Sequence, residues 1–351
     1  MFLLPHHFQQ EARHVEYAVD MRVRATGAHA WGFFELALDQ GMLAIGRIGI
    51  TRASGVLPDG TPFAIPTHDA QPMALEVPAD MRGELACLAV PLAREGVTQV
   101  GFGDDEAHEL RRWRAASEEL RDHTNAADEP ETVQTGALDL RIVRAKDALE
   151  GHALLGLARV NERRSDHQVV LDPLYIAPQT RLDATQQLSG HATLLHGLIH
   201  QRTRALAARM GQLSHGISEL ADFLMLQALN RAEPIFRQHA LVPSSHPREL
   251  YFACLQLAGE LATFTSDARV ATEYPPYRHD DLHATFVPVI ADLRRMLSTV
   301  LERNAVQIEL VDRSHGVRTA VFPDPELARS ANFVLAVNAQ MPAEQLRMRF
   351  P

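Results

Sequence analysis

The chain has 351 residues, of which 46% are hydrophobic and 22% are charged, a composition typical of a soluble globular protein with two or three domains. The formal net charge of −10 argues against a nucleic-acid-binding protein, which needs a basic surface to displace counterions, and against a protein that binds anionic lipid. Cys87 and Cys254 are the only cysteines, so the sequence predicts no disulfide framework and a reducing, cytoplasmic location.

The first predicted element is an amphipathic helix over residues 6–26. Its apolar side chains recur at steps of three and four, which places them on one helix face: Phe8, Ala12, Val15, Val19 and Val23. From residue 30 to about residue 174 the pattern changes to short β-like runs separated by turn residues. These runs cover residues 31–38, 43–56, 84–92, 137–143, 153–160 and 169–171. Many short strands at close spacing favour an antiparallel β-sandwich.

Two local signals in this region differ in strength. The tetrapeptide Pro58-Asp59-Gly60-Thr61 predicts a tight turn, because proline pre-sets the bend and glycine accepts the positive φ that closes it. Residues 108–123 have helical propensity but too few apolar residues for a clean helix face, so they remain open as strand or helix.

The pattern becomes helical again from about residue 180. Helical periodicity covers residues 188–210, 217–240, 247–263 and 282–303, with glycine, proline and serine between these segments. Four helices of this length joined by short or moderate connections favour a bundle. After residue 304 strand-like runs return at 306–311, 317–322 and 332–338, separated at first by a His315-Gly316 turn.

The expected fold is therefore a multidomain α+β chain. Residues 1–178 would form the N-terminal helix and the antiparallel β-sandwich, and residues 179–305 would form the four-helix bundle. Residues 306–351 would begin a small mixed C-terminal domain, because a domain of about 45 residues is difficult to stabilise alone.

A search for catalytic motifs gives little. The sequence holds no glycine-rich phosphate loop, no G-x-S-x-G nucleophile motif and no paired C-x-x-C, so it predicts no enzyme and no cofactor. The one candidate metal cluster is His279-Asp280-Asp281-Leu282-His283, to which His196 and His200 could add ligands. An adjacent His-Asp pair on a helical domain also resembles HD-type metal-dependent phosphohydrolases. The favoured interpretation is instead that Asp280 and Asp281 cap the fourth helix, and no metal site is expected.

Other conspicuous residues have structural interpretations. Trp31, Phe33 and Phe34 are expected to anchor the sandwich core, with an exposed partner patch as the alternative. Gly259 lies in the middle of a predicted helix, where glycine costs roughly 1 kcal/mol relative to alanine. A close helix–helix approach at Gly259 is the expected compensation.

Several stretches resemble the TssK (ImpJ/VasE) family of type VI secretion baseplate proteins. The opening Met1-Phe2-Leu3-Leu4-Pro5-His6-His7-Phe8-Gln9 is similar to the family's signature start. Further similar segments follow in order at residues 30–33, 54–63, 170–173, 229–234, 246–251, 257–261 and 277–282. The resemblance covers nearly the whole chain, although the family has a short lead before this opening and a C-terminal head that continues past Pro351.

The resemblance implies a β-sandwich shoulder, a helical neck and a C-terminal head that assemble as a homotrimer, with an architecture similar to that of phage receptor-binding proteins. It implies a non-enzymatic adaptor in which the shoulder binds the TssF–TssG wedge. The head would contact the cytoplasmic parts of the TssJ–TssL–TssM complex at the inner face of the inner membrane. The alternatives are an HD-type hydrolase and a phage receptor-binding-like protein.

Two sets of contact residues follow as hypotheses. The first is the apolar, proline-stiffened start of the chain as the wedge contact: Met1, Phe2, Leu3, Leu4, Pro5, His6 and Phe8. The second is a set of neck residues divided between the bundle core and the trimer axis: Leu220, Phe223, Leu224 and Leu293.

Overall fold

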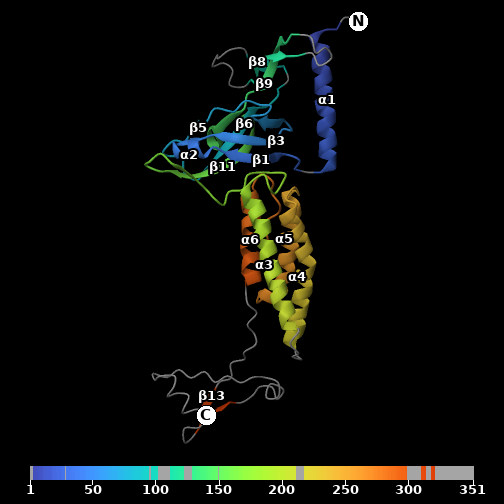
Figure 1. Ribbon diagram of the computed structural model, residues 1–351, viewed down its shortest axis with the longest axis vertical. Helices are drawn as coiled ribbons and strands as arrows, with labels where there is room; N and C mark the ends of the chain where they lie inside the picture. Colours follow the sequence, from blue (N-terminus) through green and yellow to red (C-terminus); the bar gives the residue numbers. More distant parts are fainter. Residues whose placement is uncertain are drawn as a thin grey trace.

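A computed structural model describes residues 3–27, 29–94, 96–101, 111–121, 129–148, 150–210, 217–298, 310–313 and 318–320. Figure 1 shows three parts along the long axis: a β-rich part with a separate N-terminal helix, a set of long helices below it, and the C-terminal strands. The predicted α+β class is confirmed by this arrangement.

The β-rich part contains two larger sheets that share one hydrophobic core. One sheet has the order β1-β3-β4, formed by Gly32–Leu38, Ile50–Val56 and Pro62–Ile65. The other has the order β10-β6-β11-β12, formed by Arg141–Arg144, Glu84–Pro91, His152–Arg163 and Val169–Leu171. Buried side chains from both sheets, such as Phe33, Phe63, Leu88 and Leu155, belong to the same cluster.

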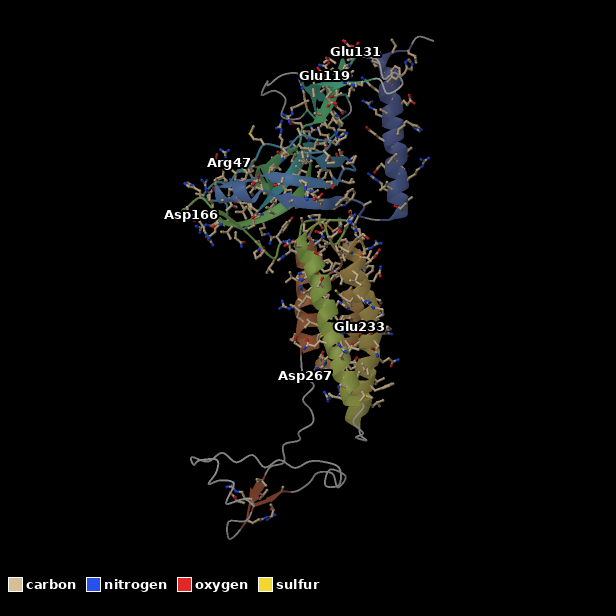
Figure 2. All side chains as sticks on the ribbon, in the orientation of Figure 1. Arg47, Glu119, Glu131, Asp166, Glu233 and Asp267 are labelled. Atoms are coloured by element: carbon tan, nitrogen blue, oxygen red, sulfur yellow. The ribbon has the colours of Figure 1, made fainter. Side chains whose placement is uncertain are left out.

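Smaller pairings complete this part. The short strands β2 (Arg47–Ile48) and β5 (Leu75–Glu76) pair with each other. Strands β7 (Val100–Gly101), β8 (Trp113–Leu120) and β9 (Glu131–Leu138) form a third sheet. The β8–β9 hairpin projects away from the long helices, and Glu119 and Glu131 mark its far end in Figure 2. The undecided segment 108–123 is thus a strand over its residues 113–120.

The predicted turn at residues 58–61 is confirmed. It is bonded to the chain just before strand β8, where the β8–β9 hairpin begins. The Leu57 N–H donates to the Thr61 carbonyl across 2.8 Å, and Gly60 adopts φ +91°. A buried ion pair of 2.9 Å between Asp59 and Arg112 fixes the turn to the residue before β8. The same guanidinium donates to the Pro91 carbonyl at the end of β6 across 2.6 Å.

Glycine is required where β1 meets β3. Phe33 pairs with Gly55 in the ladder, and a Cβ at Gly55 would lie 2.3 Å from the carbonyl oxygen of Gly32. No atom tolerates that approach, and the neighbour is main chain rather than a flexible side chain. The two strands therefore approach so closely only because residue 55 has no side chain.

The helical part packs four helices around a second hydrophobic core. They are α3 (Gln186–Met210), α4 (Ile217–Leu241), α5 (Pro247–Thr265) and α6 (Leu282–Ser298). Fully buried side chains from all four meet, for example Leu195, Leu229, Tyr251 and Phe286. The predicted helices are confirmed within the described residues. After them the structure describes only β13 (Leu310–Asp312) and β14 (Arg318–Ala320), which pair antiparallel; the His315-Gly316 turn, the predicted run 332–338 and most of 306–351 lie outside the described residues.

Three local predictions are wrong. A short helix, α2 (Gln40–Ala44), replaces the start of the run predicted at 43–56, because the Asp39 carboxylate accepts from the Met42 N–H and caps it. Phe34 is 43% exposed, because it falls at a register shift between Phe33 and Glu35 in the β1–β3 ladder, whereas Phe33 is buried in the core. A Cβ at Gly259 would meet nothing nearer than the Ala271 Cβ at 4.0 Å, so no close helix approach explains this glycine.

Candidate interaction surfaces and the junction between sheets and helices

Helix α1 (Pro5–Thr26) stands beside the sheets without burying any residue. Figure 1 shows it running alongside the β-rich part, and Figure 2 shows its side chains projecting on all sides. Its main apolar stripe is exposed, with exposed fractions from 41% to 60%: Leu4, Phe8, Val15, Val19 and Val23. Because helices in proteins are stabilised mainly by packing of an apolar face, and this face is uncovered in the subunit, the stripe is a candidate contact surface.

The start of α1 is ordered by a local bond. The Leu4 N–H donates to the Nδ1 atom of His7 across 3.0 Å, and Pro5 occupies the first helical position. Of the residues in the wedge hypothesis, Leu3, Leu4, His6 and Phe8 are exposed, whereas Met1 and Phe2 lie outside the described residues. The described part of this segment is therefore accessible to a partner.

The residues of the trimer hypothesis fall into two groups. Leu293 on α6 is fully buried in the helical core. Leu220, Phe223 and Leu224 are exposed on the first turns of α4, at the end of the helices far from the sheets. In Figure 1 both α1 and α4 lie on the same side of the molecule. The structure thus separates one residue that holds the subunit together from three that are free to contact another chain.

The junction between sheets and helices is made largely by side chains that bond to main-chain oxygens. The Nε2 atom of His279 lies 2.6 Å from the Trp31 carbonyl, and the Nδ1 atom of His283 lies 2.7 Å from the Leu174 carbonyl. The Nε2 atom of His246 lies 3.1 Å from the carbonyl of His29. Because a carbonyl only accepts, each of these ring nitrogens carries the hydrogen and donates.

The chain between β12 and α3 adds main-chain bonds to this junction. The Phe33 N–H donates to the Pro178 carbonyl across 2.9 Å, and the Thr180 N–H donates to the Phe33 carbonyl across 3.1 Å. Gln179 between them is fully buried, and its amide bonds to the Arg181 carbonyl and the Thr185 hydroxyl, both at 2.7 Å. The strand β1 is therefore fastened directly to the segment that leads into the helices.

The candidate metal cluster is not assembled as a ligand set. His279 and His283 use ring nitrogens to bind the carbonyls named above. The Asp281 carboxylate accepts from the Ala284 N–H across 3.0 Å at the start of α6, which confirms the cap interpretation for this residue. His200 pairs with Glu233 on α4 at 2.6 Å. Within the described ranges, no group of three or more His, Cys, Asp or Glu side chains is placed to hold a metal ion.

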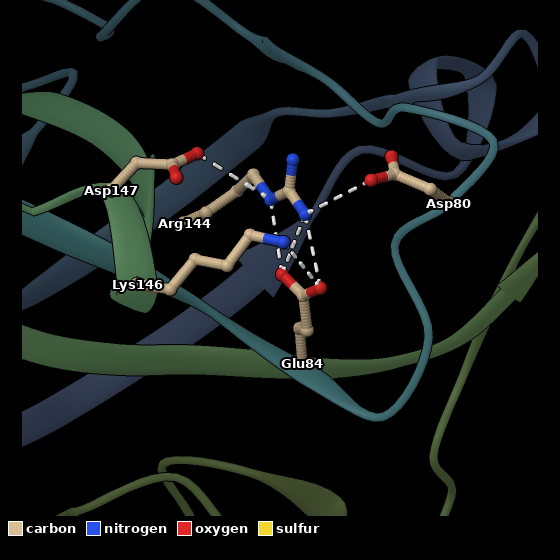
Figure 3. Close-up of polar contacts among 5 residues, drawn as sticks. All are labelled: Asp80, Glu84, Arg144, Lys146 and Asp147. Carbon is tan, nitrogen blue, oxygen red and sulfur yellow. Dashed lines mark hydrogen bonds and ion pairs between the residues drawn. The ribbon is translucent and has the colours of Figure 1, made fainter.

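A charged network lies at the edge of the four-stranded sheet. Figure 3 shows Arg144 of β10 bonded to both carboxylate oxygens of Glu84 on β6, at 2.8 and 3.0 Å. Lys146 donates to the same carboxylate across 2.8 Å, and these bonds, first from Lys146 and then from Arg144, lower the pKa of Glu84. Asp80 and Asp147 flank the guanidinium. Each charged side chain has an opposite partner, and the pair of Arg144 with Glu84 fastens β10 to β6.

In the part of the chain that the structure describes, no helix combines the length and the hydropathy needed to span a bilayer. What these residues do present is uncovered apolar helix surface on two elements. Such surfaces are candidate sites of contact with other protein chains.

Comparison with known proteins identifies the family of the chain. The family model described as "Bacterial Type VI secretion, VC_A0110, EvfL, ImpJ, VasE" matches residues 7–351. The chain is 42% identical to the type VI secretion system baseplate component TssK1 of Pseudomonas aeruginosa, over all of this chain and 79% of that protein. This chain belongs to the TssK family.

The solved structures agree. A crystal structure of TssK has a TM-score of 0.81 at 36% identity and covers 100% of this chain and 79% of its own. TssK in a TssK–TssF–TssG baseplate subcomplex has a TM-score of 0.73 at 26% identity, covering 85% of this chain and 95% of its own. The fold is therefore shared with TssK in a crystal structure and with TssK in a baseplate subcomplex.

Proposed function

We propose that this chain is a structural adaptor of a type VI secretion baseplate that works as a homotrimer. Its shoulder binds a TssF–TssG wedge, and its head contacts the cytoplasmic parts of TssL and TssM in the TssJ–TssL–TssM complex. The protein connects the wedge to the membrane complex, and no residue is assigned a catalytic role. The observation that carries the proposal is the match to TssK proteins along the full chain, one of them solved together with TssF and TssG.

The three parts of the structure support the proposal that each part has its own role. Residues 1–178, with the two sheets and α1, serve as a β-sandwich shoulder. Residues 179–305 serve as the four-helix-bundle neck, and residues 306–351 begin the head. The protein acts at the cytoplasmic face of the inner membrane, where a baseplate and a membrane anchor meet.

Copurification tests the wedge contact. The unmodified 351-residue chain should copurify with a coexpressed TssF–TssG pair, and deletion of residues 1–5 should abolish this recovery. The reason is that the deletion removes Leu3, Leu4 and the proline that starts α1, all at its exposed end. His14→Glu, an exposed change farther along α1, serves as the control and should leave recovery intact.

Unchanged recovery of the deletion variant would show that the wedge binds elsewhere on the shoulder. Failure of the unmodified chain itself to bind TssF and TssG would contradict the adaptor function. Light scattering on each sample shows whether the deletion has also changed the number of subunits.

The trimer hypothesis assigns Leu220, Phe223 and Leu224 to contacts between necks. Replacing Phe223 and Leu224 with glutamate is expected to convert a trimer into monomers, because six carboxylates at one three-fold axis would repel and lose their hydration. Light scattering at micromolar concentration measures the mass, and circular dichroism should show unchanged helix content. Gln201→Glu on the exposed surface of α3 is the control for added charge. A monomeric unmodified chain would refute the trimer.

A further inference from the structure

Three histidine rings from distant parts of the sequence stack at the junction. The ring of His279 lies 5.1 Å from that of His29, at an interplanar angle of 24°, and 5.2 Å from that of His246, at 20°. The Trp31 ring meets His279 edge-on at 4.6 Å. His29 lies between α1 and β1, His246 caps α5, and His279 precedes α6. The stack therefore ties the segment that follows α1 to two helices of the neck.

The hydrogen bonds of His246 require a neutral ring. The Nδ1 atom of His246 accepts from the Arg248 N–H across 3.1 Å, which is the N-cap bond of α5, while its Nε2–H donates to the His29 carbonyl. The Nδ1 atom of His279 lies 2.8 Å from the Tyr277 hydroxyl, which donates to it when the ring is neutral with its hydrogen on Nε2. His29 adopts φ +67°, an uncommon conformation for a residue with a side chain, so contacts must hold it there.

A proton on His246 would break this arrangement directly. Its Nδ1 atom would then carry a hydrogen that points at the Arg248 N–H, so the N-cap bond would become a clash of two donors. The new positive charge would also lie at a helix N-terminus, where the helix dipole opposes it. The rings of His279 and His29, stacked against it, carry no negative charge that could compensate the new positive charge.

The charged neighbours act in both directions. Arg248 lowers the pKa of His29 and of His246, whereas Glu249 raises the pKa of His246 and Asp280 raises those of His29 and His279. Burial is the largest cause for all three rings and lowers each pKa, for His279 to about 4. The folded junction therefore resists protons that an unfolded chain would accept. Its contribution to stability is complete above about pH 6.5 and is lost as the pH falls toward the pKa values of the folded rings.

We propose that His29, His279 and His246 form an acid-sensitive latch, which holds the segment after α1 against the neck and opens when His246 is protonated. When the latch opens, α5 loses its N-cap and residues 29–31 lose the side chains that bind their carbonyls. The direction of α1 relative to the neck is then no longer fixed. This device is a property of the subunit and does not depend on which partner the shoulder binds.

Hydrogen–deuterium exchange on the full chain between pH 7.5 and 4.5 tests the latch, with rates corrected for the intrinsic pH dependence. Protection of peptides covering residues 27–33 and 246–252 should fall by up to about tenfold for each pH unit below about 6.5, the ordinary pKa of an exposed imidazole. Protection in the middle of α3 should stay constant over the same range. The fluorescence of Trp31, isolated by Trp113→Phe, should shift to the red at the same pH because the ring becomes hydrated.

The variant His246→Asn separates the latch from general acid unfolding. Asparagine caps a helix and does not titrate, so the first turn of α5 should keep its protection at every pH. Residues 27–33 should exchange rapidly even at pH 7.5, because the bond to the His29 carbonyl is gone. His14→Asn, exposed on α1, should behave as the unmodified chain. An unmodified chain with constant protection, or a His246→Asn variant whose α5 still responds to pH, would overturn the latch.

Discussion

Replacing Leu293 with alanine is expected to lower the free energy of unfolding by about 3 to 5 kcal/mol. The side chain is fully buried on α6 among residues of the helical core, so its removal loses transfer free energy and leaves a cavity. Chemical denaturation of each variant measures the change. Because Leu293 has no exposed surface in the subunit, the number of subunits in the folded variant should not change.

Leu241→Ala is the matched control for this loss. Leu241 ends α4 and is 66% exposed, so the same truncation there should change stability by less than about 1 kcal/mol. A similarly small effect at Leu293 would mean that α6 does not pack as described. A dissociated but stable Leu293 variant would place this residue at a subunit contact instead.

Gly55→Ala is expected to destabilise the β-rich part by about 2 to 3 kcal/mol, although it adds only one methyl group. The added Cβ would collide with the main chain of β1, so the ladder between β1 and β3 must separate or shift. Separation would also disturb the bonds that Phe33 makes to residues 178 and 180. Thermal unfolding followed by circular dichroism measures the loss.

Gly190→Ala in α3 is the control for this glycine. A Cβ there would meet no atom within 4 Å, and alanine has the higher helix propensity, so a gain of up to about 1 kcal/mol is expected. Equal behaviour of the two variants would show that β1 and β3 can move apart without cost.

Much of the element order could be predicted from periodicity, because long helices with one apolar face leave a clear signal. The errors arise where a neighbour in space decides the outcome. Phe33 and Phe34 are identical in chemistry, and the register shift in the β1–β3 ladder at Phe34 separates the buried ring from the exposed one. Strand β8 has little apolar pattern of its own and exists because β9 pairs with it along eight residues.

The sequence also could not separate the apolar residues of the contact surfaces from those of the core. Leu220 and Leu293 both occupy apolar positions of periodic helices, and the sequence assigned them to one group. Only packing shows that one is 60% exposed and the other 0%. The histidine stack gave no local signal at all, because His29, His246 and His279 are separated by more than two hundred residues at the extremes and meet only in the fold. The sequence pattern around His279 is its pair of adjacent aspartates, whereas its partners in the fold are a carbonyl, a tyrosine and the rings of His29, His246 and Trp31.

At the junction, residues on the sheet side and residues on the helix side should differ in how well they tolerate substitution. On the sheet side the bonding atoms of residues 29, 31 and 174 are carbonyl oxygens, which every amino acid supplies. On the helix side the donors are imidazole nitrogens, whose position and reach few other side chains reproduce. In a deep mutational scan, these three bonds would therefore leave Leu174 open to many residues and hold His246, His279 and His283 to very few.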